Sequence, residues 1–277
     1  MPSLIHGASQ AASILPPGLS RGRLLPVRIS LFLAALACIT AAVLMHTSLL
    51  ERRLVRADPD AIPGNPALMG FARGRGEALF QTYCASCHGT RGEADGARGI
   101  PDLSDADWLY GTGSVSDIEQ IIRYGIRSHH PKAWNLAIMP AYATARPSIR
   151  DDKIPALSPG NIRDLVEFLA REQGRSADAA AAKRGAELFG GVAGCYDCHA
   201  ADGKGDSSIG APNLTDRITL YGDGSRESLS MSIAYGRHGM CPAWATRISA
   251  AGIREVALFV YSLSHPQDRA PAAPGAG

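Results

Sequence analysis

The sequence predicts a mainly α-helical protein, with one membrane-spanning helix near its N-terminus and then two copies of a single helical unit. Three observations support this fold class. An unbroken run from Ile29 to Leu50 carries no formally charged side chain. Beyond that run, the sequence matches itself when Cys84 is aligned with Cys195. Each copy also ends in a stretch whose apolar residues recur at helical spacing, at 161–170 and at 253–263.

The apolar run from Ile29 to Leu50 is long enough to cross a membrane, which takes about 20 residues in a helix. A cleaved signal peptide is the alternative, because Arg21, Arg23 and Arg28 stand just before the run. The apolar part of a signal peptide, however, is usually only about 7 to 15 residues long. We therefore predict a cytoplasmic N-terminal segment at 1–28 and a transmembrane helix at 29–50.

Two Cys-x-x-Cys-His motifs carry the chemistry of the chain, and they coincide in the self-match. They consist of Cys84, Cys87 and His88 in the first copy and of Cys195, Cys198 and His199 in the second. In c-type haem attachment, two such thiols bond to the haem vinyl groups and the histidine supplies an axial nitrogen to the iron. A zinc ribbon would place its cysteine pairs at short spacing, and a thioredoxin-like pair would lie between a strand and a helix. The sequence thus predicts two covalently bound haem c groups.

Each copy has the order of elements of a class I cytochrome c domain: helix, haem motif, Gly-rich loop, short helix, ligand loop and closing helix. A unit of roughly 90 to 105 residues has difficulty building a core alone, and a haem adds a large apolar surface for helices to pack on. The predicted boundaries are a linker at 51–71, the first cytochrome c domain at 72–174, a linker at 175–182, the second domain at 183–265 and a disordered tail at 266–277.

The distal side of the first haem has an evident candidate ligand. Methionine is a common sixth ligand in cytochromes c, and Met139 stands in the first copy just before Pro140. The alternative is a core methionine that fills a gap. We predict that Met139 binds the iron held by His88.

The second copy has no methionine at the matching position, where Cys241 stands instead. Four arrangements stay open there. Met240 could reach the iron after a one-residue shift of the loop, or Cys241 could bind as a thiolate and lower the reduction potential. His238 could give a bis-histidine site, or the position could be open to small molecules. Met240 and Cys241 are the favoured candidates opposite His199.

Several further motifs resemble those of the dihaem subunit of cbb3-type cytochrome c oxidases. They lie at 107–111, 117–127 and 139–142 in the first copy and at 210–216, 235–237 and 242–244 in the second. The likeness covers about residues 70 to 264 and follows the domain order of that family. It implies that His88, Met139 and His199 are axial ligands, whereas Cys241 stands where the family has methionine.

The compartment follows from the haem rather than from charge. Arginines flank the apolar run on both sides, so the positive-inside rule gives no orientation. Bacterial c-type haem is attached on the outer face of the cytoplasmic membrane, which predicts an inner-membrane protein with its haem domains in the periplasm. A formal net charge of only +2 argues against nucleic acid as a partner.

These observations predict a membrane-anchored dihaem cytochrome that transfers electrons from a periplasmic donor to a cbb3-like terminal oxidase. The donor would be a soluble cytochrome c or a quinol-oxidising complex, and the partners would be the other oxidase subunits. One alternative is the electron-accepting cytochrome of a periplasmic dehydrogenase, with dehydrogenase subunits as partners. Another is a haem-based gas or redox sensor at the second haem, suggested by Cys241. The chain is not expected to be catalytic by itself, because the haem carries the electron chemistry.

Overall fold

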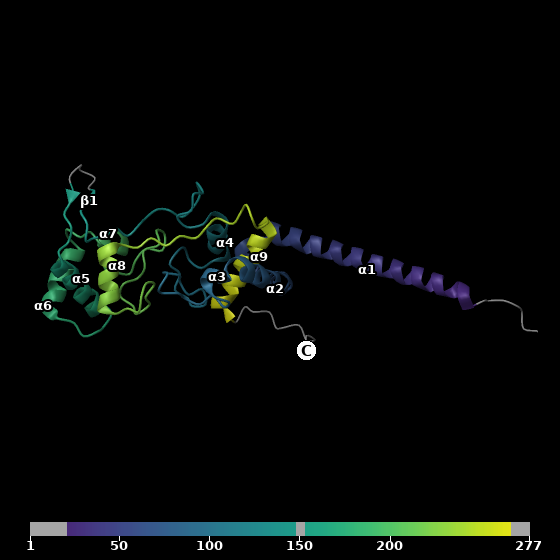
Figure 1. Cartoon of the computed structure of the whole chain (residues 1–277), viewed down its shortest axis with the longest axis horizontal. Coiled ribbons are helices and arrows are strands. Elements are labelled where there is room, and N and C mark those ends of the chain that lie inside the picture. Colours follow the sequence, from purple (N-terminus) through teal and green to yellow (C-terminus); the bar gives the residue numbers. More distant parts are fainter. Residues whose placement is uncertain (1–20, 148–152, 267–277) are drawn as a thin grey trace, which may run out of the picture. The chain divides into compact units, whose positions relative to one another are not determined.

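The computed structural model describes residues 21–147 and 153–266 (Figure 1). Positions 1–20 of the predicted cytoplasmic segment, and the predicted tail from 267 onward, lie outside the described residues. In the described chain the regular secondary structure is helical apart from two short strands, which confirms the mainly α fold class. It divides into two units, 1–49 and 50–277, which are considered separately below.

The first helix is longer than the predicted transmembrane segment. Helix α1 runs over Arg21–Arg56, and its part from Ile29 onward is long and apolar enough to span a membrane, with a mean hydropathy of 2.2 over an 18-residue window. The helix continues past Leu50 because no glycine or proline interrupts the chain between Leu50 and Pro59. Arg53 and Arg56 in its last turn also suit the negative end of the helix dipole.

The remaining elements belong to the second unit. In chain order they are η1 (Pro59–Ala61), α2 (Pro66–Tyr83), α3 (Ala85–His88), α4 (Val115–Tyr124), β1 (Arg146–Pro147), β2 (Lys153–Ile154), α5 (Pro159–Glu172), α6 (Ala179–Phe189), α7 (Tyr196–His199), α8 (Arg226–Tyr235) and α9 (Ala250–Ser264). The two strands pair antiparallel, with Arg146 opposite Ile154.

The helix ends follow local sequence signals that the two copies share. A serine side chain accepts a hydrogen bond from a first-turn N–H at the start of α4, α5, α8 and α9. The chain leaves α4 at Gly125 and α8 at Gly236, whose φ angles are +79° and +71°. Glycine adopts that conformation without the steric cost that a side chain would bring. These two turns direct the loops that follow α4 and α8.

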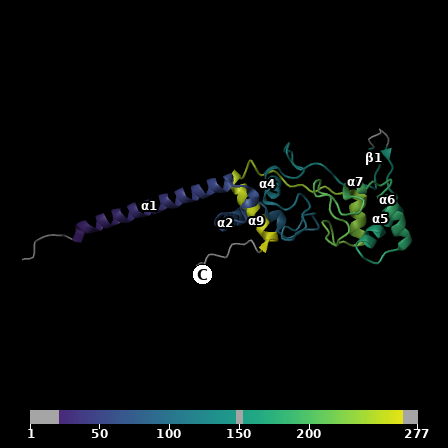
Figure 2. The same ribbon diagram turned by 180° about the vertical axis from the view of Figure 1, so that it is seen from behind.

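The helices do not group in space by sequence copy. Helix α9, which closes the second copy, packs on α2 and α4 of the first, whereas α5, which closes the first copy, packs on α6 and α8 of the second. Both views show α9 beside α2 and α4, and α5 beside α6 (Figure 2). We call α2, α3, α4 and α9 the first body, and α5, α6, α7 and α8 the second body.

Each body has its own hydrophobic core, built in the same way. In the first body, the rings of Phe80 and Phe259 lie 5.1 Å apart; in the second body, those of Phe168 and Phe189 also lie 5.1 Å apart. Close helix crossings need glycine: a Cβ on Gly76 would lie 2.0 Å from the carbonyl oxygen of Glu255. Gly185 makes the equivalent approach in the second body, with 2.1 Å to the carbonyl oxygen of Asp164. The two bodies are thus pseudo-equivalent, each made of helices from both copies.

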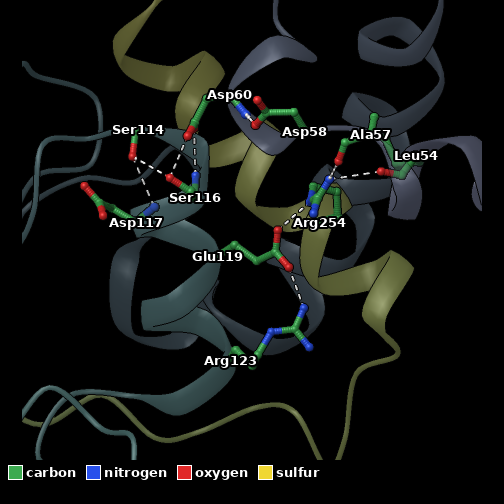
Figure 3. A network of polar contacts seen from close by, with 10 residues as sticks. All are labelled: Leu54, Ala57, Asp58, Asp60, Ser114, Ser116, Asp117, Glu119, Arg123 and Arg254. Carbon is green, nitrogen blue, oxygen red and sulfur yellow. Dashed lines mark hydrogen bonds and ion pairs between the residues drawn. The ribbon is translucent and has the colours of Figure 1, made fainter.

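A buried polar network joins the end of α1 to the first body (Figure 3). Arg254 of α9 forms an ion pair with Glu119 of α4, which also contacts Arg123. The Arg254 guanidinium donates to the carbonyl oxygens of Leu54 and Ala57, at 3.0 and 3.1 Å. Carbonyls at a helix C-terminus lack partners within the helix, so Arg254 satisfies the end of α1 from within the first body.

Candidate haem sites

The second haem motif opens onto an apolar cavity. Cys195, Cys198 and His199 line it, with α7 holding the histidine one turn beyond the first cysteine. Apolar side chains of the second body form much of its wall, among them Leu165, Leu169, Phe189, Leu229 and Ile233. A covalently held, flat apolar group such as a haem suits a cavity of this composition.

The imidazole of His199 is oriented as a haem ligand requires. Its Nδ1 lies 3.0 Å from the carbonyl oxygen of Pro212. A carbonyl only accepts, so Nδ1 carries the proton and Nε2 keeps its lone pair for a metal. Burial lowers the pKa of His199, against the opposing effect of the Pro212 hydrogen bond, and the ring stays neutral at physiological pH.

The first haem motif follows α2 directly. Cys84 ends that helix and α3 carries His88, whose ring lies 6.5 Å from that of Phe80. Burial lowers the pKa of His88, opposed by the nearby Pro101 carbonyl and assisted by Arg98. The Nδ1 atom of His88 is buried, and no atom in the described part of the chain meets full hydrogen-bonding geometry with it. A neutral, half-buried imidazole beside two thiols fits an axial ligand of a covalently attached haem.

Met139 lies at the second haem motif, not at the first. It lines the cavity that contains His199 and packs against the core of the second body. Its backbone pairs with Arg237 in an antiparallel bridge, with N···O distances of 3.2 and 3.1 Å. The sequence order paired Met139 with His88, and the structure corrects that pairing. The physical reason is the exchange of the closing helices, since the loop before α5 enters the second body with that helix.

Cys241 lies at the first haem motif by the same exchange. It pairs with Ile126 in an antiparallel bridge, with N···O distances of 3.0 and 2.9 Å. Its thiol lies close to the thiols of Cys84 and Cys87, so that repulsion between their thiolate forms adds to burial in raising the pKa of Cys84. Burial, assisted by the nearby Cys87, raises the pKa of Cys241 to about 11. The prediction that placed this residue opposite His199 is therefore corrected as well.

The other two candidates of that loop, Met240 and His238, are exposed, Met240 over 71% of its surface. Arg127 and Arg237 line the cavity, whereas Arg123 forms an ion pair with Glu119.

Some residues that shape the sites belong to no recognised metal-binding or catalytic motif. Pro101 and Pro212 stand at matching positions after the two haem histidines and present backbone carbonyls to the imidazoles. Tyr110 and Tyr221 line the cavity and come from a repeated Leu-Tyr-Gly sequence. Both pairs of residues occupy matching positions in the two copies, so the internal repeat points to these positions but does not show what they contact.

The helical fold, the duplicated core and two attachment motifs, each with a histidine whose pKa is lowered by burial, define a dihaem c-type cytochrome. The chain carries two covalently bound haem c groups, one for each of its two cytochrome c domains. The family model of cytochrome c matches residues 74–172, and that of subunit III of the cbb3-type cytochrome c oxidase matches residues 180–260.

Comparison with known proteins identifies the particular family. The chain is 40% identical over 225 residues to the cbb3-type cytochrome c oxidase subunit CcoP of Rhodobacter capsulatus, an alignment that covers 78% of this chain and 71% of that protein. It is 36% identical over 214 residues to CcoP of Cereibacter sphaeroides, covering 77% and 69%. It is also 36% identical over 216 residues to the subunit FixP of Azorhizobium caulinodans, covering 78% and 68%. The chain belongs to this CcoP and FixP family.

Proposed function

We propose that the chain is the membrane-anchored electron-transfer subunit of a cbb3-type oxidase, and that it passes electrons through its two haems to the other subunits. The observation that carries this proposal is the arrangement of two haem motifs in one compact unit, 50–277. Because each body uses helices of both copies, neither haem site is complete without the other copy. A relay needs its haems at a constant separation, and exchanged helices provide that constraint.

The residues divide into three roles. Cys84, Cys87, Cys195 and Cys198 form the thioether bonds that hold the haems. His88 and His199 act as proximal ligands, the latter with its tautomer set by Pro212. Met139 acts as the distal ligand of the haem at His199, where its thioether favours the reduced iron and raises the potential. The haem itself supplies the electron chemistry.

The orientation and partners complete the proposal. Helix α1 anchors the chain in the inner membrane, with the unit 50–277 in the periplasm, where c-type haem is attached. The donor is a soluble cytochrome c or a quinol-oxidising complex. The relatives' names support an oxidase as the acceptor rather than a periplasmic dehydrogenase.

Purification of the tagged full-length chain from membranes tests this function. We expect subunits containing haem b and copper to copurify, and two c haems per chain in a pyridine haemochrome assay. A variant with Cys195→Ala and Cys198→Ala should retain one c haem. Copurification with a quinoprotein or a flavoprotein instead would contradict the oxidase assignment.

A further inference from the structure

We propose that Cys241 supplies the distal sulfur ligand of the first haem, as a thiolate opposite His88, so that the two haems of this chain differ in ligand charge. This inference rests on the proposed function, because it requires a haem at Cys84 and Cys87.

The backbone places Cys241 at the first site as it places Met139 at the second. Cys241 exchanges two hydrogen bonds with Ile126, and Met139 exchanges two with Arg237. Ile126 and Arg237 correspond to each other in the alignment of the two copies. Met139 lines the cavity that contains His199. The bridge of Cys241 to Ile126 is equivalent to the bridge of Met139 to Arg237, so it brings Cys241 to the distal side of the haem held by His88.

Two glycines make this register possible at both sites. A Cβ on Gly125 would lie 2.4 Å from the carbonyl oxygen of Cys241, and a Cβ on Gly236 would lie 2.4 Å from that of Met139. The segment that contains Cys241 or Met139 therefore lies directly against a glycine in each body. The loop with Cys241 is thus held as firmly as the loop with Met139.

The surroundings of the Cys241 sulfur agree with a ligand rather than a surface thiol. It lies near the thiols of Cys84 and Cys87. Cys84 packs against the core of the first body together with the edge-on pair of Tyr83 and Trp244, whose ring centroids are 5.5 Å apart. The thiol makes a long contact of 3.7 Å with the adjacent carbonyl of Pro242. Binding to iron would replace that weak contact with a stronger bond.

Binding is a balanced exchange with no change of oxidation state. The S–H bond of Cys241 breaks, an Fe–S bond forms to ferric iron, and the proton leaves to solvent; a coordinating thiol is deprotonated outright. An anionic sulfur stabilises ferric over ferrous iron more than a neutral thioether does. The first haem therefore has the lower potential of the two, and the haem paired with Met139 the higher.

The test compares the full-length wild type with Cys241→Met, Cys241→Ala and a matched control, Met240→Leu, at the adjacent exposed position. Low-temperature paramagnetic resonance of the oxidised protein should show one low-spin haem with the narrow g-spread of thiolate ligation in the wild type and in the control. Both Cys241 variants should lose that signal. In Cys241→Met, the near-infrared methionine-to-iron band should double per chain.

Three outcomes would overturn the inference: no thiolate signal in the wild type, a thiolate signal that survives in Cys241→Ala, or a ligand change in Met240→Leu. If Cys241→Ala does not fold, the wild type and Cys241→Met still decide. The haem count separates this failure from failure of the proposed function. Two c haems per chain without a thiolate signal would reject only the role of Cys241, whereas fewer than two would reject the dihaem relay.

Discussion

The ring of Tyr221 occupies the space that a side chain at Gly99 would need: a Cβ there would lie 2.0 Å from Cε1 of the tyrosine. Tyr110 stands in the same relation to Gly210, at 2.1 Å. Each contact joins one copy to the other, and the alignment of the two copies converts one contact into the other. The two copies are therefore interlocked through pairs of a glycine and a tyrosine, in addition to the exchanged helices.

The Gly99→Ala variant should lose more stability than a glycine replacement without such a neighbour. Gly174 is the matched control, because its φ of +65° is close to the +68° of Gly99 and no heavy atom of the described residues lies within 4 Å of its Cβ position. Positive φ alone costs about 1–2 kcal/mol for alanine, and displacing a ring adds about 1–3 kcal/mol. Thermal unfolding of both variants, followed by haem absorbance, measures the difference. Equal losses of stability in the two variants would show that the Tyr221 ring moves aside at little energetic cost.

The haem chemistry of this chain could be predicted from its sequence more fully than the packing of its helices. The haem motifs are local patterns, so Cys84, Cys87 and His88 could be assigned from spacing alone. The exchange of closing helices could not be predicted, because duplication makes both partners look alike. Phe80 packs on Phe259, yet the sequence-equivalent Phe168 offers the same ring at the same helical position.

The same ambiguity explains the distal ligands. Met139 lies in the first copy, and only the destination of α5 determines which haem it meets. The sequence also underestimates the extent of α1, because a change from apolar to charged residues at Glu51 ends the membrane signal without ending the helix. The composition of a segment indicates whether it lies in a membrane or in water, but it does not determine where a helix ends. The helix continues until the chain approaches a residue such as Pro59 that cannot extend it.

Removal of Arg254 should destabilise the first body strongly. Its side chain is 8% exposed and pairs with Glu119, which is 11% exposed. Removing Arg254 leaves the Glu119 carboxylate with Arg123 as its partner and takes away the donor to the carbonyls of Leu54 and Ala57. Breaking a buried ion pair in this way costs about 3–5 kcal/mol. Arg91 is the control: it is 84% exposed in its pair with Glu93, and its replacement should cost less than about 1 kcal/mol.

Denaturant unfolding of Arg254→Met and Arg91→Met measures both values. The double variant Arg254→Met, Glu119→Gln should recover part of the loss, because it also removes the buried carboxylate that has lost its Arg254 partner. If Arg254→Met and Arg91→Met lost similar stability, the network at the end of α1 would have no structural importance.

The ion pair between Arg226 of α8 and Glu167 of α5 should make the stability of the second body depend on pH. Hydrogen bonds from the Arg226 side chain and from the backbone N–H of Asp178 lower the pKa of Glu167 below its ordinary value of 4.5. A carboxylate with a lowered pKa in the folded state contributes stability above its unfolded pKa, and loses it as the pH falls through the folded value. The stabilisation should therefore be complete above about pH 4.5 and decline below it.

The free energy of unfolding, measured against pH for the wild type and for Glu167→Gln, checks this. The difference between the two should be constant near neutral pH and shrink as the solution is made more acidic than the ordinary glutamate pKa. The difference in unfolding free energy between the wild type and Arg226→Met should shrink on acidification in the same way, because this variant removes the partner that lowers the Glu167 pKa. A difference that grew on acidification would mean that the folded state raises that pKa instead.

The crossed pairing of Met139 with His199 can be separated from pairing within a copy by removing one haem at a time. The near-infrared methionine-to-iron band of the oxidised protein reports Met139, and Met139→Leu should abolish it. In the variant with Cys84→Ala and Cys87→Ala, which lacks the first haem, the band should persist, since Met139 lines the cavity of Cys195 and Cys198. In the variant with Cys195→Ala and Cys198→Ala, it should vanish. The opposite result would mean that Met139 serves the haem at His88 and that the loops before α5 and α9 follow their own copies once haem is bound.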